Sequence, residues 1–114
     1  MEVIKTNVTD KKQLFRLTHA QSARKVQDLE GQVVAVNEYV LYLDGEAPAE
    51  GEEDKRKRVL ALDLNGEAYG TISPTLIDSL VDILDAFEDE SDWAVEIRSG
   101  VSKNGRKFIY AVVV

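Results

Sequence analysis

The stretch that decides the fold is RVLALDLNGEAYGTISPTLIDSLVDILDAF, residues 58 to 87. Alternating large apolar residues predict a strand over 58–64. The pair Asn65-Gly66 predicts a tight hairpin turn, and the residues after it predict a second strand over 68–73. Ser73 is a favoured helix cap and Pro74 a favoured first helical residue, so the apolar stripe that follows predicts a helix over 74–87.

The segments on either side of this stretch also predict strands. Residues 31–43 predict one apolar strand. Its alternation slips at Asn37-Glu38, which indicates a bulge or bend. Residues 93–100 and 107–114 predict the last two strands, joined by a hairpin at Asn104-Gly105. Strand–strand–strand–helix–strand–strand is the order of an OB-fold, so the sequence predicts a mainly β, five-stranded OB-fold-like barrel with its helix between strands three and four.

The N-terminal part adds a short helix to this single domain of residues 1–114. Thr9 or Asp10 is a suitable cap, and the helix is predicted to end near His19 or to continue with a break to about Lys25. Residues 44–57 have no apolar periodicity and change from acidic to basic, which predicts a mobile loop.

Length and composition restrict the class of protein. The chain has 114 residues, no cysteine, and no apolar run of the roughly 20 residues that a membrane helix needs. No apolar segment follows the first residues, so no signal peptide is expected. We expect a protein of the cytoplasm that does not enter a membrane.

The negative charge of the chain is concentrated in two segments. Residues 44–54 and 74–92 carry 13 of the 21 acidic residues and no basic one, whereas the net charge is −7. The remaining residues therefore have an excess of Lys and Arg. Because the field at a site depends on local charge, an acidic protein of this kind can still present a positive groove.

Catalysis finds little support in the residue types present. The chain has one histidine, His19, no thiol nucleophile, and no glycine-rich phosphate loop before a helix. The acidic residues from Glu88 to Asp92 are typical of a solvated turn, although carboxylates of this kind also bind Mg²⁺. We expect a protein that is not an enzyme and has neither a cofactor nor a metal.

Binding is better supported, because single-stranded nucleic acid is held by positive grooves and by aromatic rings on which bases stack. Basic residues gather before the second strand, on the fourth strand and at the last hairpin. Tyr69 and one of Tyr39 or Tyr42 are expected to be exposed, whereas Trp93 is expected in the core and Phe108 fits either place. The residues predicted to bind nucleic acid are Tyr39, Arg58, Tyr69, Arg98, Lys103, Arg106, Lys107 and Phe108.

Three stretches carry a resemblance to a known family. They are Thr9 to Thr18, the run Gly66-Glu-Ala-Tyr-Gly-Thr-Ile-Ser-Pro-Thr75 with the helix after it, and the run Ser99-Gly-Val-Ser-Lys-Asn-Gly-Arg-Lys-Phe-Ile109. Together they resemble the small single-stranded DNA-binding proteins of phages and prophages of Gram-positive bacteria, over most of the chain except residues 44–54. The resemblance implies single-stranded DNA binding and protection in phage or prophage DNA replication or recombination, inside the bacterial host cell.

Two other functions remain open. The acids of the helix over 74–87 could imitate a DNA backbone and bind a basic protein, and the whole domain could be a protein-assembly module. In either case the partner would be a protein rather than DNA. Because edge strands often pair between subunits, a homo-oligomer such as a dimer is expected. The DNA-binding function adds replication or recombination proteins as further expected partners.

Overall fold

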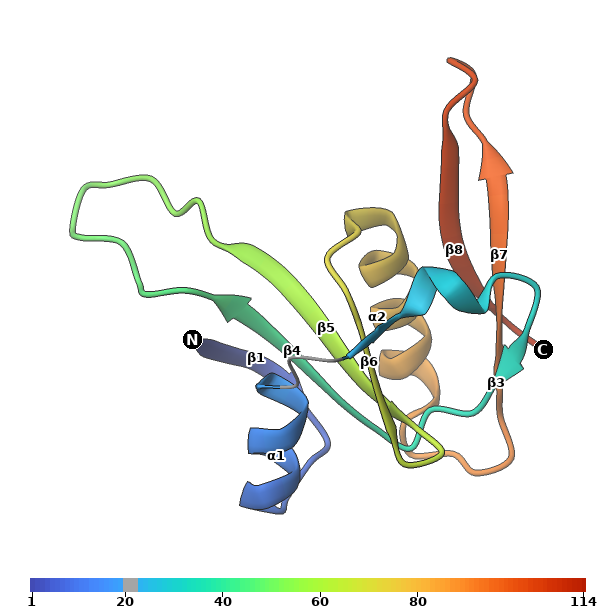
Figure 1. Cartoon of the computed structure of the whole chain (residues 1–114), viewed down its shortest axis with the longest axis horizontal. Coiled ribbons are helices and arrows are strands. Elements are labelled where there is room, and N and C mark those ends of the chain that lie inside the picture. The colour runs from blue at the N-terminus through green and yellow to red at the C-terminus, as the bar shows by residue number, and fades with distance from the viewer. Residues whose placement is uncertain (20–22) are drawn as a thin grey trace.

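The computed structural model describes residues 1–19 and 23–114, and it is mainly β, with two sheets and two α-helices (Figure 1). In chain order the elements are β1 (Glu2–Thr6), α1 (Lys11–Thr18), β2 (Arg24–Lys25), the 3-10 helix η1 (Val26–Leu29), β3 (Val33–Val34), β4 (Glu38–Asp44), β5 (Lys57–Leu64), β6 (Glu67–Thr71), α2 (Pro74–Phe87), β7 (Val95–Val101) and β8 (Lys107–Val113). The predicted helix over 74–87 is confirmed, with the Ser73 side chain accepting from the Leu76 amide.

The strands form two open sheets and not the closed barrel expected from the sequence. One sheet has the order β1-β4-β5-β6-β2 and the other has the order β3-β7-β8. Closure would require β6 to pair with β8, but the outer edge of β6 pairs with β2 in parallel. β8 contacts α2 instead. The backbone amide of Ala111 on β8 donates a hydrogen bond to Ser79 Oγ on α2 at 3.0 Å.

The predicted strand over 31–43 is divided between the two sheets. Val33 and Val34 pair with β7, whereas the chain from Glu38 onward pairs with β5. The division falls at the slip in alternation, where the Asn37 amide donates to the Asp63 carbonyl. The position of the irregularity was predicted correctly, but it is a change of sheet and not a bulge within one strand.

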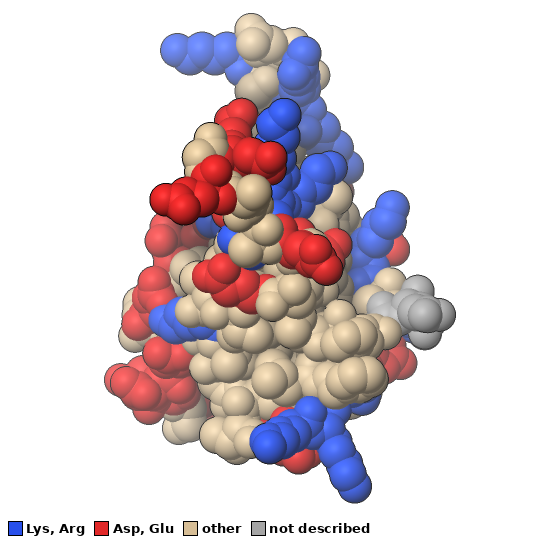
Figure 2. All heavy atoms as spheres, turned by 90° about the vertical axis from the view of Figure 1, so that its left-hand side faces the viewer, with Lys and Arg blue, Asp and Glu red and all other residues tan. Residues whose placement is uncertain are grey.

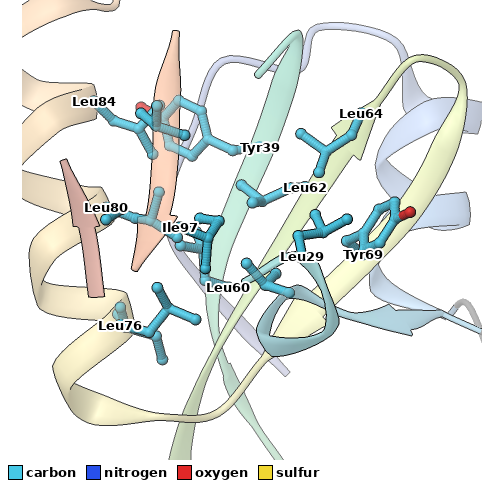
Figure 3. Packing of buried hydrophobic residues seen from close by; sticks show 14 of the residues in the cluster. Leu29, Tyr39, Leu60, Leu62, Leu64, Tyr69, Leu76, Leu80, Leu84 and Ile97 are labelled. Carbon is cyan, nitrogen blue, oxygen red and sulfur yellow. The ribbon is translucent and has the colours of Figure 1, made fainter. Parts of the chain in front are cut away.

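Both faces of the five-stranded sheet are covered, which explains why β4 and β5 are almost continuously apolar. The inner face packs against α2 and the three-stranded sheet (Figure 3), and the outer face packs against α1. The inner cluster includes Leu29, Tyr39, Leu60, Leu62, Leu64, Tyr69, Leu76, Leu80, Leu84 and Ile97. The smaller outer cluster consists of Val8, Leu17, Val40, Tyr42 and Ala61.

The helix α1 is held on the sheet by a buried carboxylate. Asp63 accepts from Arg16 and from Gln13, both at 2.6 Å. Asp10 caps the helix as predicted, and the last helical residue is Thr18. The predicted extension toward Lys25 is wrong at its end, since residues 24–25 form β2; residues 20–22 lie outside the described part of the chain.

Two short strands and a 3-10 helix were not predicted at all. β1, β2 and η1 depend on pairing and packing with distant segments, since β1 pairs with β4 and β2 with β6. Their sequences lack the length and alternation from which strands are inferred. In the part of the chain that the structure describes, no helix has the length and apolar character needed to cross a membrane.

Candidate nucleic-acid interface

Two hairpins project from the body of the molecule as arms. The β4–β5 arm carries residues 45–56 beyond its strands, and the β7–β8 arm ends in the loop 102–106. The N-terminal end of α2 lies between them (Figure 1). We call the concave surface at this end of α2 the saddle, and define it by the residues that line two adjoining grooves.

The grooves of the saddle meet at shared residues. One has a volume of about 540 Å³ and the other of about 360 Å³, and Gln27 and Ile72 line both. Ile72 is 55% exposed, so an apolar side chain lies open at their junction. The other residues that line the saddle are Ala23, Arg24, Lys25, Lys57, Arg58, Val59, Gly70, Thr71, Ser73, Pro74 and Ile77.

The saddle is positive although the protein is acidic. Among the described residues that line it, four are Lys or Arg and none is Asp or Glu. Two of these cations are paired, Arg24 with Glu67 at 3.3 Å and Arg58 with Asp78 at 2.8 Å. The two carboxylates are not among the residues that line the saddle. Lys25 and Lys57 have no described carboxylate within 4.0 Å. Two cations are therefore available to a bound anion.

Gln27 contributes an unused hydrogen-bond acceptor to the saddle. Its Oε1 atom is buried and has no partner, and it is the one side-chain atom of this kind in the described residues. Buried polar atoms in proteins are nearly always paired. Because this oxygen is buried, a ligand in the grooves would reach it only after the Gln27 side chain turned toward them.

The outer face of the β7–β8 arm presents two aromatic rings. Phe108 and Tyr110 lie on the same face of β8 with ring centroids 5.6 Å apart. The Phe108 ring lies directly over Gly100, since a Cβ there would be 2.6 Å from Phe108 Cζ. Glycine at position 100 therefore allows the ring to lie against the strand, and Phe108 remains 37% exposed.

The basic residues of this arm differ in their pairing. Arg98 pairs with Glu96, and Lys107 pairs with Glu30 at 2.6 Å. Lys103 and Arg106 at the tip are exposed and have no described carboxylate within 4.0 Å. Figure 2 shows Lys and Arg side chains at the top of the molecule, where this arm ends in Figure 1, with Asp and Glu below them.

Two predicted site residues are in the core, and their predicted exposure is wrong. Tyr39 is 1% exposed, and its hydroxyl donates to Glu88 Oε2 at 2.7 Å. Burial, followed by this hydrogen bond, raises the pKa of Tyr39 to about 12. Tyr69 is paired with Leu62 and is also buried. Tyr42 is likewise buried, in the outer cluster, so none of the three rings is available for stacking.

The predicted residues therefore fall into three groups. Arg98, Lys103, Arg106 and Phe108 lie together on the β7–β8 arm, with Lys107 on the opposite face of the same strand. Arg58 lines the saddle, and the two tyrosines are internal. Sequence reasoning missed Lys25, Gln27 and Ile72 as lining residues, because the saddle is formed by η1 and β2, whose pairing with β6 has no local signal.

No described acidic residue lines the saddle, but Glu67 and Asp78 reach its edge and pair with two of its four cations, Arg24 and Arg58. Asp78, Asp82, Asp85 and Asp89 are exposed on α2 as predicted, but Arg58 pairs with Asp78 and Lys5 with Asp85. On the β4–β5 arm, Arg56 donates to Asp54 and lowers the pKa of that carboxyl to about 2. Among the described residues no three His, Asp or Glu side chains are placed to hold a metal ion.

No protein-family model, curated protein sequence or solved structure matches this chain. The geometry of the saddle and of the β7–β8 arm is therefore the basis for assigning a function.

Proposed function

We propose that this protein binds single-stranded DNA without catalysing a reaction, with the strand lying in the saddle and along the outer face of the β7–β8 arm. The observation that carries the proposal is the charge of the saddle, where four cations and no carboxylate line the grooves of a protein with a net charge of −7. Phosphates favour such a surface because neutralising them releases condensed counterions.

The order and pairing of the elements support this proposal. The antiparallel series β4–β5–β6 is followed by α2 and then by the β7–β8 hairpin, which β3 joins at β7. This is the order of elements in an OB-fold, although the two sheets do not close into its barrel. In that fold the second and third strands and the loops of the two hairpins bind oligonucleotides. Here the corresponding parts are β5, β6 and the two arms, and the saddle lies among them.

The bases would find stacking and hydrogen-bonding partners on the same surfaces. Phe108 and Tyr110 offer ring faces, and stacking on an aromatic side chain contributes about 1–3 kcal/mol per base. Ile72 offers an apolar contact, and Gln27 Oε1, once its side chain turned toward the grooves, would accept from a base N–H group. None of these contacts reads a particular sequence, so the proposed activity is general coating of single strands, with a role in phage or prophage DNA replication or recombination.

Two pairs of substitutions test the proposal. Lys25→Ala with Lys57→Ala removes the unpaired cations of the saddle, and Lys103→Ala with Arg106→Ala removes those of the arm. Each lost phosphate contact should reduce the slope of log affinity against log salt by about 0.7 for a single strand. Fluorescence anisotropy of a labelled oligo-dT at several salt concentrations measures this slope.

Lys12→Ala is the matched control, because Lys12 is exposed and lines neither groove of the saddle. The proposal requires a normal slope for this variant and a reduced slope for both pairs. Wild-type slopes in all three variants, with the fold intact, would contradict it. Binding of a basic protein by α2 would then be the better hypothesis, although Arg58 and Lys5 already neutralise two of its acids.

A further inference from the structure

The helix α1 presents an aromatic ring that the fold does not use. Phe15 is 64% exposed, whereas its neighbours Leu14 and Leu17 pack against the sheet. The imidazole of His19 stacks on one face of Phe15, with ring centroids 4.0 Å apart and planes 10° apart. The His19 ring is held in place by the Phe15 carbonyl and by Thr18, so the two rings form a fixed stacked pair, the Phe15–His19 platform, in which Phe15 stays largely exposed.

A groove adjoins this platform. It has a volume of about 600 Å³ and is lined, among the described residues, by Phe15, Arg16, His19, Ala23, Arg24, Glu67 and Ala68. Two arginines and one carboxylate thus face a cavity with an aromatic wall. This combination of cation and ring is what single-stranded nucleic acid requires.

The cationic wall of the groove is fixed before any ligand binds. Arg16 donates from Nη2 to Asp63 at 2.6 Å and from Nε to Gln13 at 2.8 Å, which holds the guanidinium against the sheet. The Arg16 side chain is still 40% exposed, so further N–H groups are available to a phosphate. A donor that is already ordered loses little conformational entropy on binding.

The groove adjoins the saddle. Ala23 and Arg24 line both this groove and the nearer groove of the saddle, whose other lining residues follow the end of β6 toward α2. A strand leaving the saddle along β6 would therefore pass into this groove. Among the described residues that line the two grooves, Glu67, which pairs with Arg24, is the one acid.

We propose that the Phe15–His19 platform is a second base-stacking site, at which a single strand that leaves the saddle stacks one base on the open face of Phe15, with its phosphate at Arg16. The inference rests on the proposed function and extends it, because it assigns the strand a path beyond the saddle. It also predicts that affinity keeps increasing with oligonucleotide length until the strand reaches α1.

The test compares Phe15→Ala with wild type over oligo-dT of increasing length, by anisotropy. The variant should bind the shortest oligonucleotides like wild type and lose about fivefold or more in affinity for the longest, which corresponds to one stacked base. Phe15→Tyr should restore wild-type binding because it keeps the ring. Ile4→Ala, at a 49% exposed residue of β1, is the matched control and should have no effect at any length.

A fluorescent base reports stacking directly. Two oligonucleotides of the full length are needed, one with 2-aminopurine at the 5′ end and one with it at the 3′ end. Only one of them should lose fluorescence on binding to wild type, and that one should keep its fluorescence on binding to Phe15→Ala. Equal binding by Phe15→Ala and wild type at every length would overturn the inference while leaving the proposed function standing. A changed sedimentation coefficient in Phe15→Ala would also overturn it, by showing that Phe15 is a subunit contact. Failure of wild type to bind any length would overturn both.

Discussion

Two hairpins of this protein contain the same Asn-Gly pair in different surroundings. The strands of the β5–β6 hairpin, the internal hairpin, are covered on both faces, whereas the β7–β8 hairpin, the projecting hairpin, extends into solvent (Figure 1). In the β5–β6 hairpin, Asn65 and Gly66 both have positive φ values, 56° and 84°, as a two-residue turn requires. In the β7–β8 hairpin only Gly105 does, at 77°, and the longer loop is closed by a Ser102–Arg106 hydrogen bond of 2.8 Å. The same signal thus predicts a turn without predicting where the hairpin lies.

The aromatic residues of the two hairpins have correspondingly different roles. Tyr69 on β6 lies in the inner cluster (Figure 3), whereas Phe108 on β8 lies on the outer face of its sheet. The difference follows from what covers each sheet: both faces of β5 and β6 meet other elements, but only the inner face of β7 and β8 does. An aromatic residue in a strand is therefore a candidate for binding only where one face of the sheet is left open.

The largest expected effect is on the internal hairpin. Tyr69→Ala removes a buried ring from the inner cluster and should lower the free energy of unfolding by about 3 kcal/mol. Tyr69→Phe should keep most of the stability, because it retains the ring. Urea denaturation followed by circular dichroism measures both. A stable Tyr69→Ala variant with weak DNA binding would reverse the roles that we assign to the two hairpins.

The turn of the internal hairpin provides the second test. Asp63 accepts from the Gly66 amide at 2.9 Å as well as from Arg16 and Gln13, so Asp63→Ala leaves several donors without a partner. The expected loss is about 2 kcal/mol in the free energy of unfolding, since the Arg16 side chain is partly exposed and regains water. Asp63→Asn should lose less than Asp63→Ala, because it keeps the acceptor for Gly66. Equal stability of wild type and Asp63→Ala would show that the anchor of α1 is unimportant.

The projecting hairpin should respond in binding and not in stability. Phe108→Ala should weaken binding of a labelled oligo-dT by about fivefold or more, the equivalent of one stacked base, with little change in the melting temperature. Val101→Ala is the matched control, because Val101 is 71% exposed on the same arm. Val101 is the pairing partner of Lys107, and both lie on the face of the hairpin opposite to that of Phe108. A Phe108→Ala variant that unfolds as readily as Tyr69→Ala would place Phe108 in the core.

The smallest expected effect concerns Tyr39, the other internal tyrosine. Its pKa is raised by burial and by Glu88 to about 12, above the value near 10 of an unfolded chain. The unfolded state therefore loses this proton first, so the stability that the neutral hydroxyl contributes is complete below pH 10 and declines as the pH rises toward 12. Tyr39→Phe should show a weaker decline than wild type in denaturation measured from pH 8 to pH 11.5. Parallel curves would show that the hydroxyl is not held in its neutral form.

The sequence predicts the elements better than it predicts their surroundings. The cap at Ser73, the helix over 74–87 and the strand β5 are determined locally, and their predicted positions are confirmed to within a residue. The burial of Tyr69 could also have been predicted. A two-residue turn at 65–66 places Leu62 opposite Tyr69, and cross-strand partners share a face, so Tyr69 belongs with the apolar row of β5.

Other features have no local signal. The two sheets do not close into a barrel because β2 pairs with the edge of β6. These two strands are far apart in the sequence, so no periodic pattern reveals that they pair. The saddle depends on the same pairing, because it brings Lys25 to the surface formed by Lys57 and Ile72. The exposure predicted for Tyr39 is wrong because residues 31–43 do not form one continuous strand, and the change of sheet after Asn37 places Tyr39 on the inner face. The homodimer expected from the sequence stays a prediction.

The most direct test of the central claim is a titration of a labelled dT oligonucleotide of about 30 residues with the wild-type protein, by anisotropy at several salt concentrations, with a duplex of equal length as the control. We expect tight binding of the single strand only, weakening steeply as salt increases. Absence of binding at low salt, or equal binding of the duplex, would contradict it.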